Sequence, residues 1–289
     1  MSFCLPEATL TLDWGNLAYL EHSPKSLIES KITLLFLHGW LDNAASFEST
    51  IEALTKLEPN LRCIALDLAG HGHSDHKGAG QYYSFHEYLD DISQLLVKLS
   101  ASRCLIIGHS LGALLASCYS AAFPEQVAGL IQIEGVLPIA EKSDNHSKRI
   151  RQAVVSRQRL RTKPVKSMAS FESALIRRSR VNEINPELIM PVVKRGTVVK
   201  SERWYWSHDP RLLSDSIYRM SPEHSLAIAK SVQCPWQVVL GKDGYADLSA
   251  QAHDCLNEDQ ISMIQGGHHC HMQQPQAIAE IILGLVNKI

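Results

Sequence analysis

The stretch Gly108-His109-Ser110-Leu111-Gly112 has the residue types and spacing that nucleophilic catalysis requires. An apolar run, 105–107, precedes it, and a helix-forming segment, 113–116, follows at once. In a G-x-S-x-G pattern of this kind, a sharp turn between a strand and a helix lifts the serine oxygen clear of the backbone, and the helix N-terminus directs positive charge at it. Glycine is needed on both sides because the strained turn leaves no room for a Cβ. The pattern predicts that Ser110 is a nucleophile.

A serine is a poor nucleophile unless a base takes its proton and an acid orients that base. His268, His269 and His271 follow the last strand-like stretch, 260–264, and are the candidate bases. The candidate acids also follow apolar stretches. Glu134 comes directly after 127–133, at the carboxyl edge of a predicted strand, where side chains reach the rim of a parallel sheet. Asp243 follows another strand-like stretch, and Asp247 is a third possibility.

A second motif predicts a different chemistry. The residues His71-Gly72-His73-Ser74-Asp75-His76 match H-x-H-x-D-H, which resembles the zinc-ligand string of metallo-β-lactamase-like hydrolases. That class needs further ligands downstream, for which His253 and 268–271 are available, but it leaves the Ser110 pattern unexplained. A dinuclear zinc hydrolase using His71, His73, Asp75 and His76 is therefore the alternative. The main hypothesis is that this stretch forms a tight glycine-rich turn after Asp67, which is itself a turn residue. The active site is then expected to need no metal or cofactor.

Composition and charge limit the possible partners. The chain has 289 residues and a formal net charge of -2, which argues against a general nucleic-acid binder and leaves a small molecule as the expected partner. Residues 141–230 hold 19 of the 28 Lys and Arg residues but only 9 of the 30 Asp and Glu residues. We interpret this basic segment as a solvated helical face rather than an anion-attracting entrance. The sequence does not indicate an oligomeric state.

The cysteines and the apolar runs bear on location. Seven cysteines are odd in number and scattered, and several lie in apolar runs, as expected for reduced residues in a reducing compartment. The N-terminus has no basic stretch followed by an apolar one, so we expect no signal peptide. No apolar run approaches the roughly 20 residues of a membrane span. We therefore expect a cytoplasmic protein.

Strand-like and helical stretches alternate along most of the chain, which predicts an α/β fold with a parallel sheet and crossover helices after an opening hairpin. From about 138 to 230 the pattern changes to helical, basic and proline-broken, with only 197–199 as strand material. This predicts a core formed by 1–136 and 232–289 and a helical cap formed by 137–231. Caps exclude water and shape the substrate pocket.

Five segments carry a resemblance to a known family: 38–40, 70–74, 108–112, 195–197 with 208–211, and 267–275. With them the chain resembles the α/β-hydrolase superfamily from its first hairpin to its last helix, and within it the serine hydrolase-like proteins of the capped branch. The resemblance implies an α/β-hydrolase fold, with a mostly parallel eight-stranded sheet flanked by helices and a helical cap inserted into it.

The resemblance also implies roles for individual residues. In the family pattern G-H-x-x-H-x-x-x-P the base follows the glycine, which is His268 here, so His269 and His271 become structural neighbours. Most members place the acid at the position occupied here by Gly244. Haloalkane dehalogenases place it after the sixth strand, which favours Glu134 over Asp243.

The oxyanion donors follow from the same resemblance, and the two pocket tryptophans from the aromatic surface of the predicted cap. The donors are expected to be the backbone amides of Trp40 and Leu111. Candidate pocket residues are His38, His109, Trp204 and Trp206, with core packing as the competing interpretation of the two tryptophans.

The sequence thus predicts a serine hydrolase that cleaves a small carboxylic ester through an acyl-enzyme. Epoxide hydrolases and haloalkane dehalogenases use an aspartate nucleophile, and Ser110 counts against both. Thioesterase, C–C hydrolase and perhydrolase activities share the triad and stay open. Besides the zinc hydrolase, a ligand-binding hydrolase-fold protein with low turnover is the other alternative.

Overall fold

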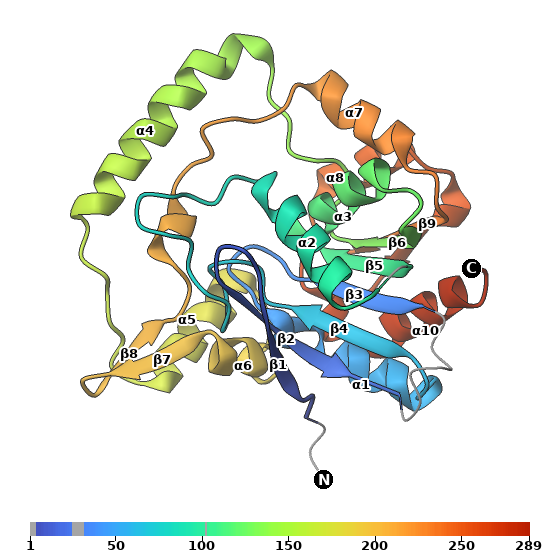
Figure 1. Cartoon of the computed structure of the whole chain (residues 1–289), viewed down its shortest axis with the longest axis horizontal. Helices are drawn as coiled ribbons and strands as arrows, with labels where there is room; N and C mark the ends of the chain where they lie inside the picture. Colours follow the sequence, from blue (N-terminus) through green and yellow to red (C-terminus); the bar gives the residue numbers. More distant parts are fainter. Residues whose placement is uncertain (1–3, 25–31, 102) are drawn as a thin grey trace.

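The computed structural model describes residues 4–24, 32–101 and 103–289 and contains an eight-stranded sheet (Figure 1). The strand order is β1-β2-β4-β3-β5-β6-β9-β10, in which β2 pairs antiparallel with β1 and β4 and the other pairs are parallel. The strands are β1 (Glu7–Thr11), β2 (Asn16–His22), β3 (Thr33–Leu37), β4 (Arg62–Leu66), β5 (Cys104–His109), β6 (Val127–Ile133), β9 (Trp236–Gly241) and β10 (Ile261–Ile264). The predicted fold, a mostly parallel eight-stranded sheet with helices, is confirmed.

Helices cover both faces of this sheet, which is why its central strands are apolar throughout. One face packs against α1 (Glu48–Leu57) and α10 (Pro275–Val286), and the other against α2 (Glu87–Lys98), α3 (Leu111–Ala122) and α8 (Ala246–His253). Successive side chains of a strand point to opposite faces. In β3, Leu35 joins the cluster under α2 and α3, whereas Phe36 joins the cluster under α1 and α10. The loops at the carboxyl ends of the parallel strands are left free to carry a site.

The segment between β6 and β9 forms a separate group of elements. It contains α4 (His146–Thr162), α5 (Phe171–Asn182), α6 (Pro186–Arg195), β7 (Thr197–Lys200), β8 (Arg203–Trp206) and α7 (Pro222–Ser231). Figure 1 shows α4 at the periphery, while α5, α6 and the β7–β8 hairpin lie close together. The sequence predicted strand only at 197–199, so β8 is an addition. Within the described ranges, no helix has both the length and the apolarity to cross a bilayer.

A buried ion pair joins this segment to the sheet. Asp67 follows β4 and is fully buried, and its Oδ2 lies 2.8 Å from Nη2 of Arg195 at the end of α6. Asp67 also accepts hydrogen bonds from the backbone amides of Ala44 (2.7 Å) and His73 (2.8 Å). A buried carboxylate needs this degree of pairing because leaving it unpaired costs several kcal/mol. The turn residue Asp67 is therefore also an anchor for α6.

Candidate active site

Ser110 lies on the turn between β5 and α3, with φ 49° and ψ -115°. Positive φ is strained for a residue with a side chain and is held only when its surroundings require it. A Cβ at Gly112 would lie 2.0 Å from the carbonyl oxygen of Leu37, and one at Gly108 would lie 2.3 Å from that of Gly112. Both glycines of the motif are therefore required by close backbone contacts. The predicted strand-turn-helix around Ser110 is present.

His268 lies in the loop between β10 and α9 (Cys270–Gln273), and its Nδ1 is 3.2 Å from Oε2 of Glu134. Glu134 follows β6 directly and its side chain is 1% exposed. A carboxylate oxygen only accepts hydrogen bonds, so Nδ1 of His268 carries a proton and Nε2 of the neutral ring is left to accept one. Ser110 and His268 line the same cavity of about 690 Å³. The tertiary structure therefore brings the candidate nucleophile, base and acid together.

The Glu134 carboxylate is held in place by the loop after β9. Its Oε1 accepts a hydrogen bond from the backbone amide of Gly241 (2.7 Å), and Oε2 accepts one from that of Tyr245 (3.4 Å). A Cβ at Gly244 would lie 2.3 Å from Oε1 of Glu134, so the absent side chain makes room for the carboxylate. Asp243 is exposed, and its backbone amide bonds to Gly266. The absence of a side chain at Gly244 thus leaves a space that the Glu134 carboxylate fills.

Of the two candidate oxyanion donors, Trp40 lies in the loop after β3 and Leu111 directly follows Ser110. Leu111 is the first residue of α3, where a backbone N–H has no acceptor within the helix. Trp40 lines the 690 Å³ cavity, and its indole Nε1 donates to the carbonyl of Leu212 (3.2 Å). His38 supports this loop: Nδ1 donates to the carbonyl of Gly39 (2.7 Å) and Nε2 accepts from the amide of Leu68 (3.0 Å). Both ring nitrogens of the fully buried His38 are thus engaged in contacts with the backbone.

Ser110 lies between two cavities of different character. The first, about 410 Å³, has mainly apolar walls, which include Leu114, Leu137 and Leu248. The second, about 690 Å³, has walls of mixed character, which include the polar side chains of Arg178 and His268. Residues between β6 and β9 contribute to both. The arrangement accommodates a substrate with one apolar and one polar part on either side of the serine.

Among the described residues, the walls of these two cavities include one of the four expected pocket residues, His109. Trp204 packs on Phe171, with ring centroids 5.4 Å apart, in the apolar cluster around α5 and α6. Trp206 joins the same cluster and stacks on His208 at 6.1 Å. Both tryptophans therefore pack within the segment between β6 and β9, as the competing interpretation held.

The predicted zinc string does not form a metal site. His71 Nδ1 donates to the carbonyl of Ala69 (3.1 Å), and His73 Nδ1 contacts Glu7 (2.9 Å). Asp75 accepts a hydrogen bond from the backbone amide of Asn16 (2.8 Å), and His76 donates to the carbonyl of Ser207 (3.0 Å). These partners hold the four side chains apart, and among the described residues the ligand atoms of the four do not converge. The dinuclear zinc alternative at this string is therefore wrong.

A different group of buried polar side chains lies behind His268. We call it the histidine cluster, and it consists of Asp42, His109, His269 and His271. Burial, reinforced by the neighbouring imidazoles, holds the pKa of His109 and of His271 well below the usual histidine value. Burial alone would raise the pKa of Asp42, but the charges of His269 and Arg178 hold it well below its usual range. Asp42 was missed from the sequence because it belongs to no motif.

A family model described as the alpha/beta hydrolase fold matches residues 32–275. The chain belongs to the α/β-hydrolase family. A serine hydrolase-like protein of Danio rerio is 26% identical over 268 residues, which cover 86% of this chain and 79% of that protein. Serine hydrolase-like protein 2 of Homo sapiens is 25% identical, covering 96% of this chain and 93% of the human protein.

Solved structures show the same architecture. The crystal structure of a hypothetical protein of Pseudomonas aeruginosa PAO1 superposes with a TM-score of 0.89 at 30% identity. The superposition covers 97% of this chain and 99% of the Pseudomonas chain. The protein is thus a hydrolase of the α/β fold with relatives named as serine hydrolases.

Proposed function

We propose that this protein is a serine hydrolase that cleaves small carboxylic esters through an acyl-enzyme. Ser110 is the nucleophile, His268 the base and Glu134 the acid that orients it. The observation that carries the proposal is the 3.2 Å contact between Nδ1 of His268 and the buried Glu134 carboxylate, in a loop that shares a cavity with Ser110. This contact leaves Nε2 of His268 as the proton acceptor, which a serine nucleophile requires.

In the first half of the reaction, Ser110 Oγ attacks the carbonyl carbon of the ester while Nε2 of His268 takes the hydroxyl proton. The tetrahedral intermediate carries its negative charge on the former carbonyl oxygen, which the backbone amides of Trp40 and Leu111 stabilise. His268 then gives its proton to the departing alcohol as the C–O bond breaks. The products of this half are the free alcohol and an ester between the acyl group and Ser110.

In the second half, a water molecule replaces the alcohol. His268 takes a proton from the water as its oxygen attacks the acyl carbon, and the same two amides bind the second oxyanion. The intermediate collapses with cleavage of the bond to Ser110 Oγ, which receives the proton from His268. Glu134 stabilises the imidazolium in both halves without itself becoming protonated. The carboxylic acid leaves and the enzyme is regenerated.

The cavities support a substrate with an apolar acyl group. The 410 Å³ cavity beside Ser110 has room for a short hydrocarbon chain between Leu114 and Leu248, and residues 137–140 and Pro222 also line it. These last residues belong to 137–231, which we propose acts as a cap that sets specificity. The rates of hydrolysis of thioesters and of other acyl compounds, which the same triad chemistry can cleave, are to be compared with those of esters.

A fluorophosphonate probe tests the nucleophile directly, because it reacts with activated serines. We expect wild-type protein to label and Ser110→Ala to lose labelling; a wild type that fails to label contradicts the proposal. Hydrolysis of p-nitrophenyl esters of graded acyl length then tests turnover and substrate class. Labelling without turnover of any ester or thioester supports the alternative of a low-turnover ligand-binding protein.

A pair of cap variants tests the acyl pocket. Ile139 lines the apolar cavity and is 56% exposed, so Ile139→Trp narrows the cavity without disturbing a core. We expect it to shift the preferred acyl chain to a shorter length. Val165→Trp is the matched control, because Val165 is 60% exposed and lies outside the two walls. An unchanged chain-length profile in Ile139→Trp contradicts the assignment of this cavity to the acyl group.

The proposal includes a cytoplasmic location. All seven cysteines are free. Burial raises the pKa of the Cys270 thiol to about 12, which keeps it protonated and unreactive. Such cysteines suit a reducing compartment, and fractionation of the expressing cells tests the location.

A further inference from the structure

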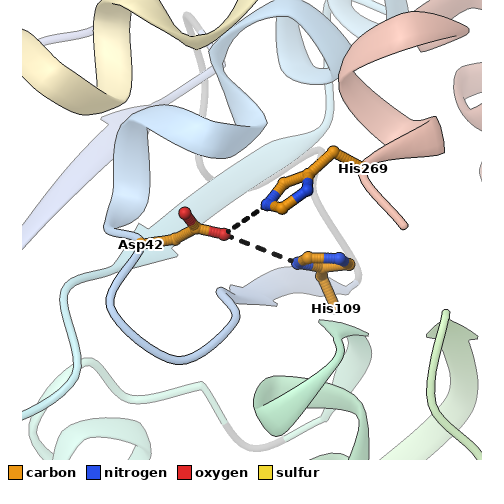
Figure 2. Close-up of side chains that lie close together, drawn as sticks. All are labelled: Asp42, His109 and His269. Atoms are coloured by element: carbon orange, nitrogen blue, oxygen red, sulfur yellow. Dashed lines mark hydrogen bonds and ion pairs between the residues drawn. The ribbon is translucent and has the colours of Figure 1, made fainter. Parts of the chain in front are cut away.

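Three side chains of the histidine cluster, Asp42, His109 and His269, bring one carboxylate oxygen and two ring nitrogens close together (Figure 2). His109 Nε2 lies 2.8 Å from the carbonyl oxygen of His268 and must donate to it, because a carbonyl only accepts. The other nitrogen of the neutral ring, Nδ1, then carries a lone pair. This atom is buried, has no hydrogen-bond partner among the described residues, and lies 3.8 Å from Oδ2 of Asp42. A lone pair facing a carboxylate oxygen is unfavourable unless a cation or proton lies between them.

His269 completes the set. Its Nε2 lies 3.1 Å from Oδ2 of Asp42 and 3.0 Å from Nδ2 of Asn182. Both interactions cannot be hydrogen bonds at once in a neutral ring, because Nε2 either donates to the carboxylate or accepts from the amide. When it accepts, the nitrogen lone pairs of two histidines and one carboxylate oxygen converge. These three ligand atoms lie within 4.8 Å of one another.

The two separations that involve the Asp42 oxygen are close to those around a tetrahedral ion. Zinc bonds to imidazole and carboxylate of about 2.0–2.2 Å place neighbouring ligand atoms about 3.3–3.6 Å apart. The separations of 3.1 and 3.8 Å from the Asp42 oxygen lie on either side of this value. Gly39 leaves the space open: a Cβ there would lie 2.8 Å from Nδ1 of His109 and 3.3 Å from Oδ2 of Asp42. Asp42, His109 and His269 also line the 690 Å³ cavity, through which an ion can enter.

We propose that Asp42, His109 and His269 form a binding site for one divalent transition-metal ion of the Zn²⁺ type. The set is two imidazoles and one carboxylate, with a fourth position open to the cavity for water. The hydrogen bond from His109 to the His268 carbonyl is the outer contact that metal-bound histidines ordinarily make. This site is distinct from the zinc string at 71–76 and takes no part in the triad chemistry proposed above.

Arg178 sets the affinity of this site. Its Nη2 lies 2.6 Å from Oδ1 of Asp42, so the guanidinium and the ion use different oxygens of the same carboxylate. An outer hydrogen bond of this kind orients a ligating carboxylate, but the positive charge also repels a divalent ion. The site is therefore built for moderate affinity and reversible occupancy. Neutralising Arg178 strengthens metal binding, an outcome that a purely structural cluster does not produce.

Occupancy inhibits the hydrolase, an inference that rests on the proposed function. The ion binds the residue before Ser110 and the residue after His268, and so joins the two catalytic loops. The ring of His268 lies 4.8 Å from that of His109. A divalent charge held by His109 therefore repels the positive charge that His268 gains in both halves of the reaction.

Titration calorimetry with ZnCl₂ on chelator-treated protein tests the binding. We expect one Zn²⁺ per wild-type chain, at least about 100-fold weaker binding in His269→Gln, and about tenfold tighter binding in Arg178→Met. His253→Gln, which removes an exposed histidine, is the matched control and is expected to bind as wild type. Binding that is absent in wild type, or equal in wild type and His269→Gln, overturns the proposal.

Cobalt substitution supplies a readout that does not depend on how a variant folds. Co²⁺ bound to wild-type protein is expected to give the intense visible bands of a four-coordinate ion, whereas the weak bands of a six-coordinate ion would refute the assigned ligand set. The same titration on Ser110→Ala separates this inference from the proposed function. Metal binding that persists in Ser110→Ala supports the site even if fluorophosphonate labelling of the wild type fails.

Inhibition is measured as the ratio of ester hydrolysis rates with and without Zn²⁺. At about ten times the dissociation constant, we expect wild-type rates to fall about tenfold and those of His253→Gln to fall equally. In His269→Gln the ratio is expected to stay near one at this concentration. Equal inhibition of wild type and His269→Gln contradicts the regulatory part of the proposal.

Discussion

Replacing Glu134 by glutamine tests the acid most sharply, because the structure dictates how the new amide must sit. Oε1 of Glu134 accepts the backbone N–H of Gly241 at 2.7 Å, and only an oxygen can do this. The amide nitrogen of the introduced glutamine must therefore replace Oε2, which faces Nδ1 of His268 at 3.2 Å. Two donors then meet, and His268 is forced to keep its proton on Nε2. A base protonated on that nitrogen cannot accept the proton of Ser110.

The expected loss follows from this tautomer change. We expect kcat/KM to fall about 10³- to 10⁴-fold, which corresponds to about 4–5 kcal/mol of transition-state stabilisation. The assay is p-nitrophenyl acetate hydrolysis by wild type, Glu134→Gln and Asp243→Asn, with circular dichroism to verify folding. Asp243→Asn is the matched control and is expected to stay within about threefold of wild type. Activity of Glu134→Gln within tenfold of wild type, or an equal loss in Asp243→Asn, refutes the assignment.

Gly244 allows the same reasoning to be tested by relocating the acid. Gly244→Asp alone places a side chain against the Glu134 carboxylate and is expected to be inactive. Glu134→Gly removes that carboxylate at a position whose φ of 52° suits glycine, and Gly244 itself does not have positive φ. The double variant Glu134→Gly/Gly244→Asp is therefore expected to recover at least tenfold activity over Glu134→Gly. No recovery in a folded double variant would show that the loop after β9 cannot present an acid to His268.

Three further predictions concern stability. Arg195→Met leaves the fully buried Asp67 carboxylate unpaired and is expected to lower the free energy of unfolding by about 3 kcal/mol in urea titrations; a loss below about 1 kcal/mol contradicts the anchoring role. Burial lowers the pKa of His208 from 6.5 to about 4. The contribution of the neutral ring to the free energy of unfolding is therefore complete above pH 6.5 and falls by up to about 3 kcal/mol as the pH drops toward 4. His208→Gln should flatten this pH profile. Gly112→Ala places a Cβ 2.0 Å from a backbone oxygen and should lower the melting temperature. In Gly284→Ala, in α10, the new Cβ points into open space, so the melting temperature should not fall.

Local signals in the sequence determined most of the elements and the nucleophile Ser110, whereas the choice of His268 as the base came from the family resemblance. The strand-turn-helix around Ser110 follows from an apolar run, two glycines and a helix-forming segment, all within about a dozen residues. The parallel sheet follows from the alternation of buried strands with amphipathic helices, whereas its eight strands were expected from the family resemblance. The β8 strand was missed because its aromatic residues, including Trp204, form a strand only by pairing with β7 and packing on Phe171.

Only the tertiary structure decided which distant residues meet. The sequence offered Glu134 and Asp243 as acids, and the choice depends on the parallel pairing of β6 with β9, which places the Glu134 carboxylate over Gly244. It also offered a compact string of zinc ligands at 71–76, whose side chains turn to separate partners. The atoms that do converge come from Asp42 in the loop after β3, His109 at the end of β5 and His269 in the loop after β10. Spacing along the chain sets which residues can act locally, but the meeting of loops at one edge of a sheet is set by topology.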